Sequence, residues 1–129
     1  MNRNKPRVLN VGHCDFDHGN IARVLAEEFD AGVERAATIE KAFEAVRAGQ
    51  YDLVLVNRVL DADGSSGLDL IRRMQSHEET RGTPVALVSN YADAQDAAVA
   101  LGAQRGFGKD ALSKPETRDR LASLLGPSE

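Results

Sequence analysis

Polar residues or glycines follow the short apolar runs of this sequence, and they mark where chemistry could take place. They are Gly12 and His13, Asn57, Ser89, and Lys109. If these positions meet in the fold, Lys109, Ser89 and nearby backbone N–H groups could bind a free anion, such as phosphate, sulfate or an acidic side chain of a partner. The alternative is that Lys109 donates to the Asn57 carbonyl or to a neighbouring aspartate and binds nothing.

Metal-binding side chains gather near the N-terminus without forming a recognised site. His13, Cys14 and His18 lie within six positions, but their spacing matches no zinc motif and the sequence has no second cluster. We therefore predict that they bind no metal and that the protein uses no cofactor. Cys14 is expected to be a packed or half-buried thiol.

Four aspartates lie in predicted loops beside these positions and allow two interpretations. They could rebuild a metal site, or they could serve ordinary structural roles. We favour the second interpretation, in which Asp17 caps a helix and Asp61 and Asp63 are solvated turn residues, because aspartates in loops usually do this. The four residues are Asp15, Asp17, Asp61 and Asp63.

The length and composition predict one compact domain. The chain has 129 residues, 42% of them hydrophobic, so we expect a single domain over 1–129 with a core of about 6–125 and a tail of 126–129.

The apolar runs are too short to span a membrane, and the basic N-terminus resembles no signal peptide. A single cysteine agrees with a reducing compartment, and a net charge of -4 without a basic cluster argues against nucleic-acid binding. We expect a cytoplasmic protein that contacts neither membrane nor nucleic acid.

Short apolar runs alternate with longer segments of helical period, and this order predicts an α/β fold. The strongest strand is Leu53–Val56, which is apolar at each position, as in a central strand covered by helices on both faces. Strand–helix units with right-handed crossovers form a doubly wound sheet most simply. We predict a flavodoxin-like fold with five parallel strands in the order 2-1-3-4-5 and five helices.

Three segments resemble the receiver domain of two-component response regulators: YDLVLVNRVLDADGSSGLDLIRRM, TPVALVSNYAD and GAQRGFGKD. The resemblance covers nearly the whole chain. It implies phosphoryl transfer to an aspartate at the end of the third strand, with a magnesium ion held by that carboxylate and by an acidic pair after the first strand. A Ser or Thr after the fourth strand and a Lys after the fifth complete the family's site.

Matched residue by residue, this chain lacks the three carboxylates. The phosphoacceptor position falls on Asn57, and the acidic pair falls on Gly12 and His13. A glycine, an imidazole and a carboxamide do not replace three carboxylates as magnesium ligands, and the delocalised amide of Asn57 is no nucleophile. The loop 57–67 is also about two residues longer than the family's usual pattern. These departures indicate a degenerate, or pseudo-receiver, domain that keeps the fold without the phosphorylation switch.

Two positions of the family's site are retained and others depart from it. Ser89 and Lys109 match the hydroxyl residue and the lysine. Gly106 stands where the family often has an aromatic switch, so no aromatic rotamer can report activation there, and Phe107 is expected to point into the core. Asp110 stands where the family usually has a proline in a cis peptide, so we expect a trans bond after Lys109.

The resemblance also implies where partners would bind. In the family, the face formed by the fourth helix, fifth strand and fifth helix mediates homodimerisation or effector contact, and kinases and phosphotransferases dock on the first helix. The first helix of this chain includes Ile21, Ala22 and Arg23. The other face carries charges of both signs, including Asp96, Arg105, Arg118 and Arg120.

We therefore predict a non-catalytic signalling module of a two-component or phosphorelay system that acts by phosphorylation-independent protein–protein contact. Its partner would be a kinase, a phosphotransferase, an effector or a second copy of the chain. Two alternatives stay open: an anion- or small-molecule-sensing domain with its pocket at Lys109, and a receiver phosphorylated on a substitute aspartate such as Asp61 or Asp15. An enzyme is disfavoured because no paired acid and base, nucleophile elbow or glycine-rich phosphate loop is present.

Overall fold

A five-stranded parallel sheet forms the centre of the protein, whose structure, a computed structural model, describes residues 5–126. The strand order is β2-β1-β3-β4-β5, which confirms the predicted fold class and topology. Residues 127–129 of the expected tail lie outside the described residues. The strands are β1 (Arg7–Val11), β2 (Gly32–Ala36), β3 (Leu53–Asn57), β4 (Val85–Val88) and β5 (Gln104–Phe107).

Six α-helices surround this sheet within residues 5–126, one more than the sequence predicts. The additional helix, α4, has only four residues, which is too short to leave a periodic apolar pattern. A short 3₁₀ helix, Lys109–Ala111, follows β5. The α-helices are α1 (Asp15–Phe29), α2 (Ile39–Ala48), α3 (Gly67–Gln75), α4 (Glu78–Arg81), α5 (Ala92–Ala100) and α6 (Pro115–Leu125).

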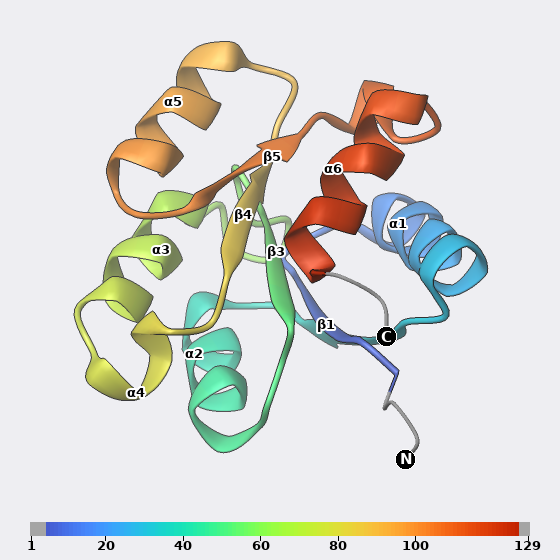
Figure 1. Cartoon of the computed structure of the whole chain (residues 1–129). Helices are drawn as coiled ribbons and strands as arrows, with labels where there is room; N and C mark the ends of the chain where they lie inside the picture. The colour runs from blue at the N-terminus through green and yellow to red at the C-terminus, as the bar shows by residue number, and fades with distance from the viewer. Residues whose placement is uncertain (1–4, 127–129) are drawn as a thin grey trace.

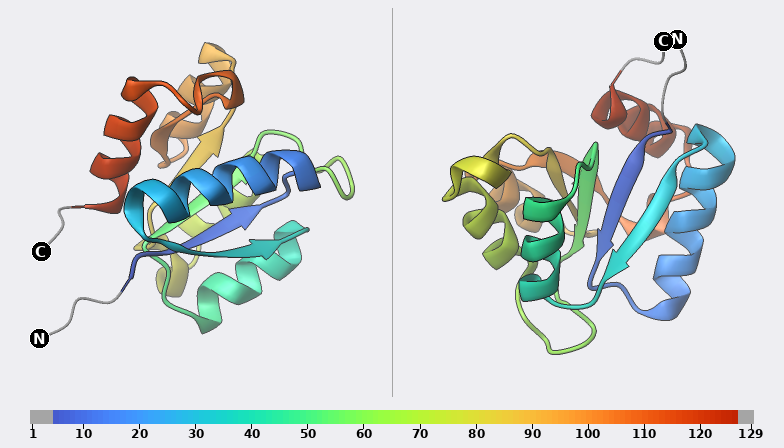
Figure 2. Two further views of the ribbon diagram at one scale, coloured as in Figure 1. Left: turned by 90° about the vertical axis from the view of Figure 1, so that its right-hand side faces the viewer. Right: turned by 90° about the horizontal axis from the view of Figure 1, so that it is seen from below.

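Each face of the sheet packs against its own group of helices (Figures 1 and 2). α2, α3 and α5 cover one face, where Phe43 and Ile71 are buried, and α1 and α6 cover the other, where Leu25 and Leu121 are buried. β3 lies between β1 and β4, and all of its residues are buried, which explains its uninterrupted apolar sequence. No helix in the described part of the chain is long and apolar enough to cross a membrane.

A buried glutamine fastens α5 to the sheet. The Nε2 atom of Gln95 donates to the carbonyl oxygens of Leu87 and Ser89 at 2.9 and 3.2 Å. Its Oε1 accepts the N–H of Gly106 at 2.9 Å, so one side chain of α5 bonds to the backbone of both β4 and β5. Gly106 has no room for a side chain, because a Cβ there would overlap the Leu87 carbonyl oxygen. Phe107 is buried in the core, as expected.

Candidate functional site

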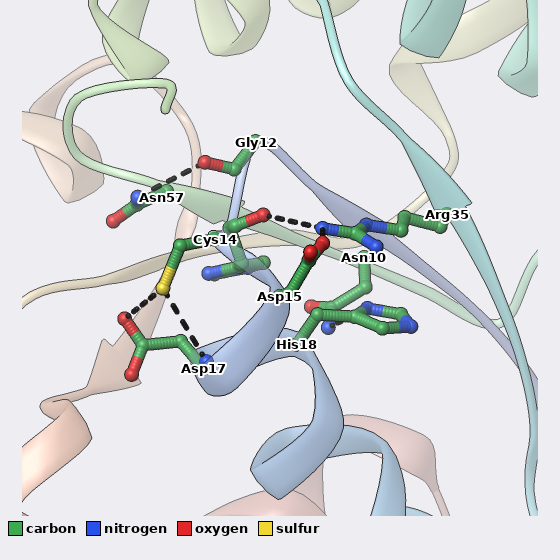
Figure 3. A network of polar contacts seen from close by, with 9 residues as sticks. Asn10, Gly12, Cys14, Asp15, Asp17, His18, Arg35 and Asn57 are labelled. Atoms are coloured by element: carbon green, nitrogen blue, oxygen red, sulfur yellow. Dashed lines mark hydrogen bonds and ion pairs between the residues drawn. The ribbon is translucent and has the colours of Figure 1, made fainter. Parts of the chain in front are cut away.

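Asn57 ends β3 and reaches across the carboxyl edge of the sheet to the end of β1. Its Nδ2 donates to the carbonyl oxygen of Gly12 at 3.1 Å, and the bond is buried (Figure 3). An ionised aspartate has no hydrogen to donate, so it could not form this bond. The carboxamide therefore serves here as a structural donor that joins β3 to β1.

Gly12 leaves no space for a side chain at the end of β1. Its backbone has φ of +76°, in the left-handed region where a residue with a Cβ is strained. A Cβ at this position would also overlap the side chain of Leu60, which is 1% exposed. Position 12 thus excludes a side chain both by its backbone conformation and by the packing around it.

Leu60 belongs to the loop 58–66, which folds back over the end of β1. Val59 and Ser66 form an isolated antiparallel bridge across this loop. The N–H of Asp61 donates to the carbonyl oxygen of Gly12 at 2.9 Å. The Gly12 carbonyl accordingly accepts one bond from the loop and one from Asn57, and the loop holds Leu60 against the glycine.

His13 turns into the protein, whereas Ser89 and Lys109 line a cavity at this edge of the sheet. Its side chain is 3% exposed, and its Nε2 donates to the carbonyl oxygen of Leu55 at 3.2 Å. The buried Nδ1 has no hydrogen-bond partner within residues 5–126. Burial lowers the pKa of His13 to about 4, because the charged ring would lose its hydration. The imidazole is therefore neutral at physiological pH and adds no positive charge to the edge.

Lys109 forms an ion pair with an aspartate of α1. Its Nζ lies 2.8 Å from Asp17 Oδ2. This is the contact with a neighbouring aspartate that the sequence analysis gives as the alternative to anion binding. The hydrogen bond from Lys109 holds the pKa of Asp17 below its ordinary value. Asp17 does not cap α1, which corrects our expectation: the N-cap is Cys14, whose Sγ accepts the N–H of Asp17 at 3.5 Å (Figure 3). The carboxylate of Asp17 is instead committed to Lys109.

Ser89 follows β4 and lines a shallow cavity of about 200 Å³ between the ends of β3 and β4. Its Oγ accepts the N–H of Tyr91 at 3.1 Å. Arg58 and Tyr91 also line this cavity, and the Arg58 guanidinium lies 5.0 Å from the centre of the Tyr91 ring. Our sequence analysis missed both residues, although Arg58 directly follows Asn57 and Tyr91 comes two positions after Ser89.

The other three candidate aspartates form no ion pair with Lys109 within residues 5–126 and no common site. Asp15 pairs with Arg35 at 2.7 Å (Figure 3), and Asp61 is exposed. Asp63 is an exposed turn residue whose Oδ1 accepts the N–H of Ser65 at 3.0 Å. Within residues 5–126, no three His, Cys, Asp or Glu side chains are grouped as metal ligands.

The sequence model of the response regulator receiver domain matches residues 17–125. The chain belongs to this family. The match includes Asn57, Ser89 and Lys109 but begins after β1, so Gly12 and His13 are assigned to the family's acidic positions by their place after the first strand. Among curated proteins, no relative is found.

Solved structures of receivers share the fold at low sequence identity. The receiver domain of the putative response regulator NarL from Mycobacterium tuberculosis is 21% identical, with a TM-score of 0.78 over 97% of this chain and 100% of that one. The chemotaxis response regulator CheY4 of Vibrio cholerae is 16% identical, with a TM-score of 0.74 over 95% and 100%. The receiver domain of the sensor histidine kinase PA1611 from Pseudomonas aeruginosa is 18% identical, with a TM-score of 0.72 over 95% of each chain, and holds a magnesium ion in its active-site cleft.

The residues of this receiver do not fit such a magnesium ion. Magnesium requires several hard oxygen ligands in an octahedral array. At position 12 the only oxygen is the carbonyl, which already accepts from Asn57 and Asp61. His13 presents no oxygen from its side chain and is turned inward. These two positions therefore supply no carboxylate that could hold the ion.

We call the end of β1 closed because Leu60 fills the space beside Gly12. This packing predicts that Gly12→Ala is more destabilising than the same change at Gly64. Both glycines have positive φ, but a Cβ at Gly64 would meet nothing within 4 Å, whereas one at Gly12 would overlap Leu60. We expect Gly64→Ala to lower the free energy of unfolding by about 1 kcal/mol and Gly12→Ala by about 3 kcal/mol, as measured by urea denaturation. Equal losses would show that Leu60 does not restrict position 12.

Burial of neutral His13 predicts a loss of stability in mild acid. His13 is protonated near pH 6.5 in the unfolded chain and near pH 4 in the folded one. The stability is therefore retained above pH 6.5 and lost as the pH falls toward 4. Between pH 7.5 and pH 5 we expect a loss of about 2 kcal/mol in the free energy of unfolding. In His13→Gln the dependence should shrink to the contribution of His18, whose pKa burial also lowers. His77→Gln, which replaces a histidine at an exposed position, is the matched control; an unchanged slope in His13→Gln would contradict the assignment.

Proposed function

We propose that this receiver is a pseudo-receiver, a non-catalytic signalling module that acts by protein–protein contact without phosphorylation. The observation that carries the proposal is the closed end of β1. There the phosphoacceptor position is a carboxamide bonded to the Gly12 carbonyl, and Leu60 occupies the space of a side chain at the first acidic position. In this arrangement the family's reaction has neither a nucleophilic carboxylate at position 57 nor a place for its metal ion.

The contacts of α5 support a role that does not depend on a phosphorylation switch. Many receivers of the family have an aromatic residue at this position of the fifth strand, and its rotamer reports activation. Here that position is Gly106, and its N–H is held by Gln95 of α5. A buried side chain with three backbone hydrogen bonds favours one position of α5. Regulation would then act through partner abundance, self-association or a ligand.

We infer that the docking surface is the face formed by α5, β5 and α6, with α1 as the second candidate. β5 is one of the two edge strands of the sheet, and α5 and α6 flank it (Figure 1). Asp96 of α5 pairs with Arg105 of β5, and Arg118 of α6 pairs with Glu28 of α1 at 3.0 Å. Arg120 is exposed and forms no ion pair within residues 5–126, so it is available to a partner.

The partner in this proposal is a kinase, phosphotransferase or effector of a two-component system, or a second copy of the chain, in the cytoplasm. Neither nucleic acid nor membrane is part of the proposal, because the net charge is -4. An effector or a second copy would contact the face formed by α5, β5 and α6, and a kinase or phosphotransferase would dock on α1.

Treatment with magnesium and acetyl phosphate tests the loss of phosphorylation. We expect intact-mass spectrometry to detect no acid-labile adduct on the wild type, and none on Asn57→Asp, because Gly12 and His13 still supply no metal-binding carboxylate. An adduct on the wild type would overturn the proposal, and Asp61→Asn and Asp15→Asn would then locate the substitute acceptor. An adduct on Asn57→Asp alone would show that the end of β1 is not closed to magnesium.

Charge reversal tests the docking surface. We expect Arg120→Glu to weaken the affinity for an effector, or for a second copy, by about tenfold without changing the unfolding midpoint. Calorimetric titration of the effector proteins of the same cell, and sedimentation of the chain alone, would measure these two cases. Arg81→Glu, an exposed site on α4, is the control and should bind as the wild type does. Equal affinities in the two variants would exclude this face.

A further inference from the structure

The cavity beside Asn57 is lined by cationic and neutral polar side chains and by no carboxylate. Its volume of about 200 Å³ is smaller than the range of about 300–1,000 Å³ that is usual for drug-sized ligands. It has room for a phosphate group or a short organic acid. Two valines complete its wall, and the polar lining residues are Asn57, Arg58, Ser89, Asn90, Tyr91 and Lys109.

Arg58 is the cation of this cavity that is free to bind an anion. It is exposed, it forms no ion pair within residues 5–126, and its guanidinium lies 5.0 Å from the centre of the Tyr91 ring. The cation–π contact restricts the flexible side chain while it leaves the N–H groups available to a ligand. A guanidinium can form two parallel hydrogen bonds to a phosphate or carboxylate group. A guanidinium that is already restrained loses less conformational freedom on binding than an unrestrained one.

Two neutral side chains add donors to the same cavity. Ser89 Oγ accepts the N–H of Tyr91, so its own hydrogen is free to point to a ligand. Asn90 Oδ1 accepts the N–H of Asp110 at 3.1 Å, and the amide hydrogens of Asn90 have no acceptor within residues 5–126. Each side chain thus accepts a bond from the backbone and has hydrogens to donate to a ligand.

The remaining charges leave the cavity with a net positive balance. Lys109 and Arg58 contribute two positive charges, and Asp17, paired with Lys109 at 2.8 Å, offsets one of them. Asn57 uses its Nδ2 on Gly12, and its Oδ1 can accept a hydrogen from a protonated oxyanion. The cavity is therefore suited to a singly charged ligand.

We infer that this cavity is a binding site for an oxyanion, either a phosphate or a carboxylate group, with Arg58 as its main ligand-binding residue. The inference goes beyond the docking role and does not depend on it. The oxyanion could belong to a small molecule or to an acidic side chain of a partner protein, and its chemistry would be the same. The ring of Tyr91, which is 57% exposed, would lie beside whatever carries the anionic group.

Titration by ¹H–¹⁵N NMR tests this site, with inorganic phosphate, phenyl phosphate and acetate as probes at constant ionic strength. We expect saturable shifts of the Ser89, Asn90 and Tyr91 amides, with chloride as the inert reference. Arg58→Gln should weaken the binding about tenfold, since it removes a charged hydrogen-bond donor. Arg81→Gln, which changes an exposed arginine outside the cavity, is the matched control.

The three probes distinguish the sources of the oxyanion. Tighter binding of phenyl phosphate than of inorganic phosphate, with no saturation by acetate, would support a small phosphorylated molecule. Saturation by acetate at the same amides would support an acidic side chain of a partner. Shifts that do not saturate, or affinities that Arg58→Gln and Arg81→Gln leave equally unchanged, would overturn the inference, and the acetyl phosphate experiment would be unaffected.

Discussion

The left-handed backbone of Gly12 controls the arrangement of the whole carboxyl edge of the sheet. Because this residue has φ of +76° and no side chain, Leu60 can occupy the space above it. The same residue offers its carbonyl oxygen to Asn57 and to the N–H of Asp61. Three consequences follow from one glycine: the long loop after β3 is attached to β1, the amide of Asn57 is committed to a structural bond, and the first acidic position of the family is closed.

The charges at this edge are rearranged around that closed end. Lys109 keeps the position that the family gives it, but its partner is Asp17 of α1. A lysine already paired at 2.8 Å is a weaker site for an added anion than an unpaired arginine. Arg58 thus becomes the available cation, held beside Tyr91 and close to Ser89. The cavity has a polar lining, and its unpaired positive charge lies on the loop after β3 and not on Lys109.

Sequence reasoning predicted the fold because each element has a local signal. The run Leu53–Val56 has the composition of a buried parallel strand, and the alternation of short runs with helical periods determines the topology. The absent carboxylates could also be found position by position. The direction of the side chains could not be predicted, because it depends on contacts between distant segments. His13 bonds to Leu55, and Asp17 pairs with a lysine 92 positions away instead of capping its own helix. The four residues of α4 are too few for any period to be visible.

The loss of the carboxylates also changes what stabilises a receiver without a metal ion. Three carboxylates within a few ångströms repel one another, and they destabilise the folded state unless a cation or protons compensate them. Glycine, neutral histidine and asparagine at these positions remove that repulsion, and Asn57 replaces it with a hydrogen bond to Gly12. Within residues 5–126, Lys109 forms its ion pair with Asp17, and the two charges balance each other. The edge can therefore keep one conformation without a bound cation and without a phosphoryl group, which is what a constitutive docking module requires.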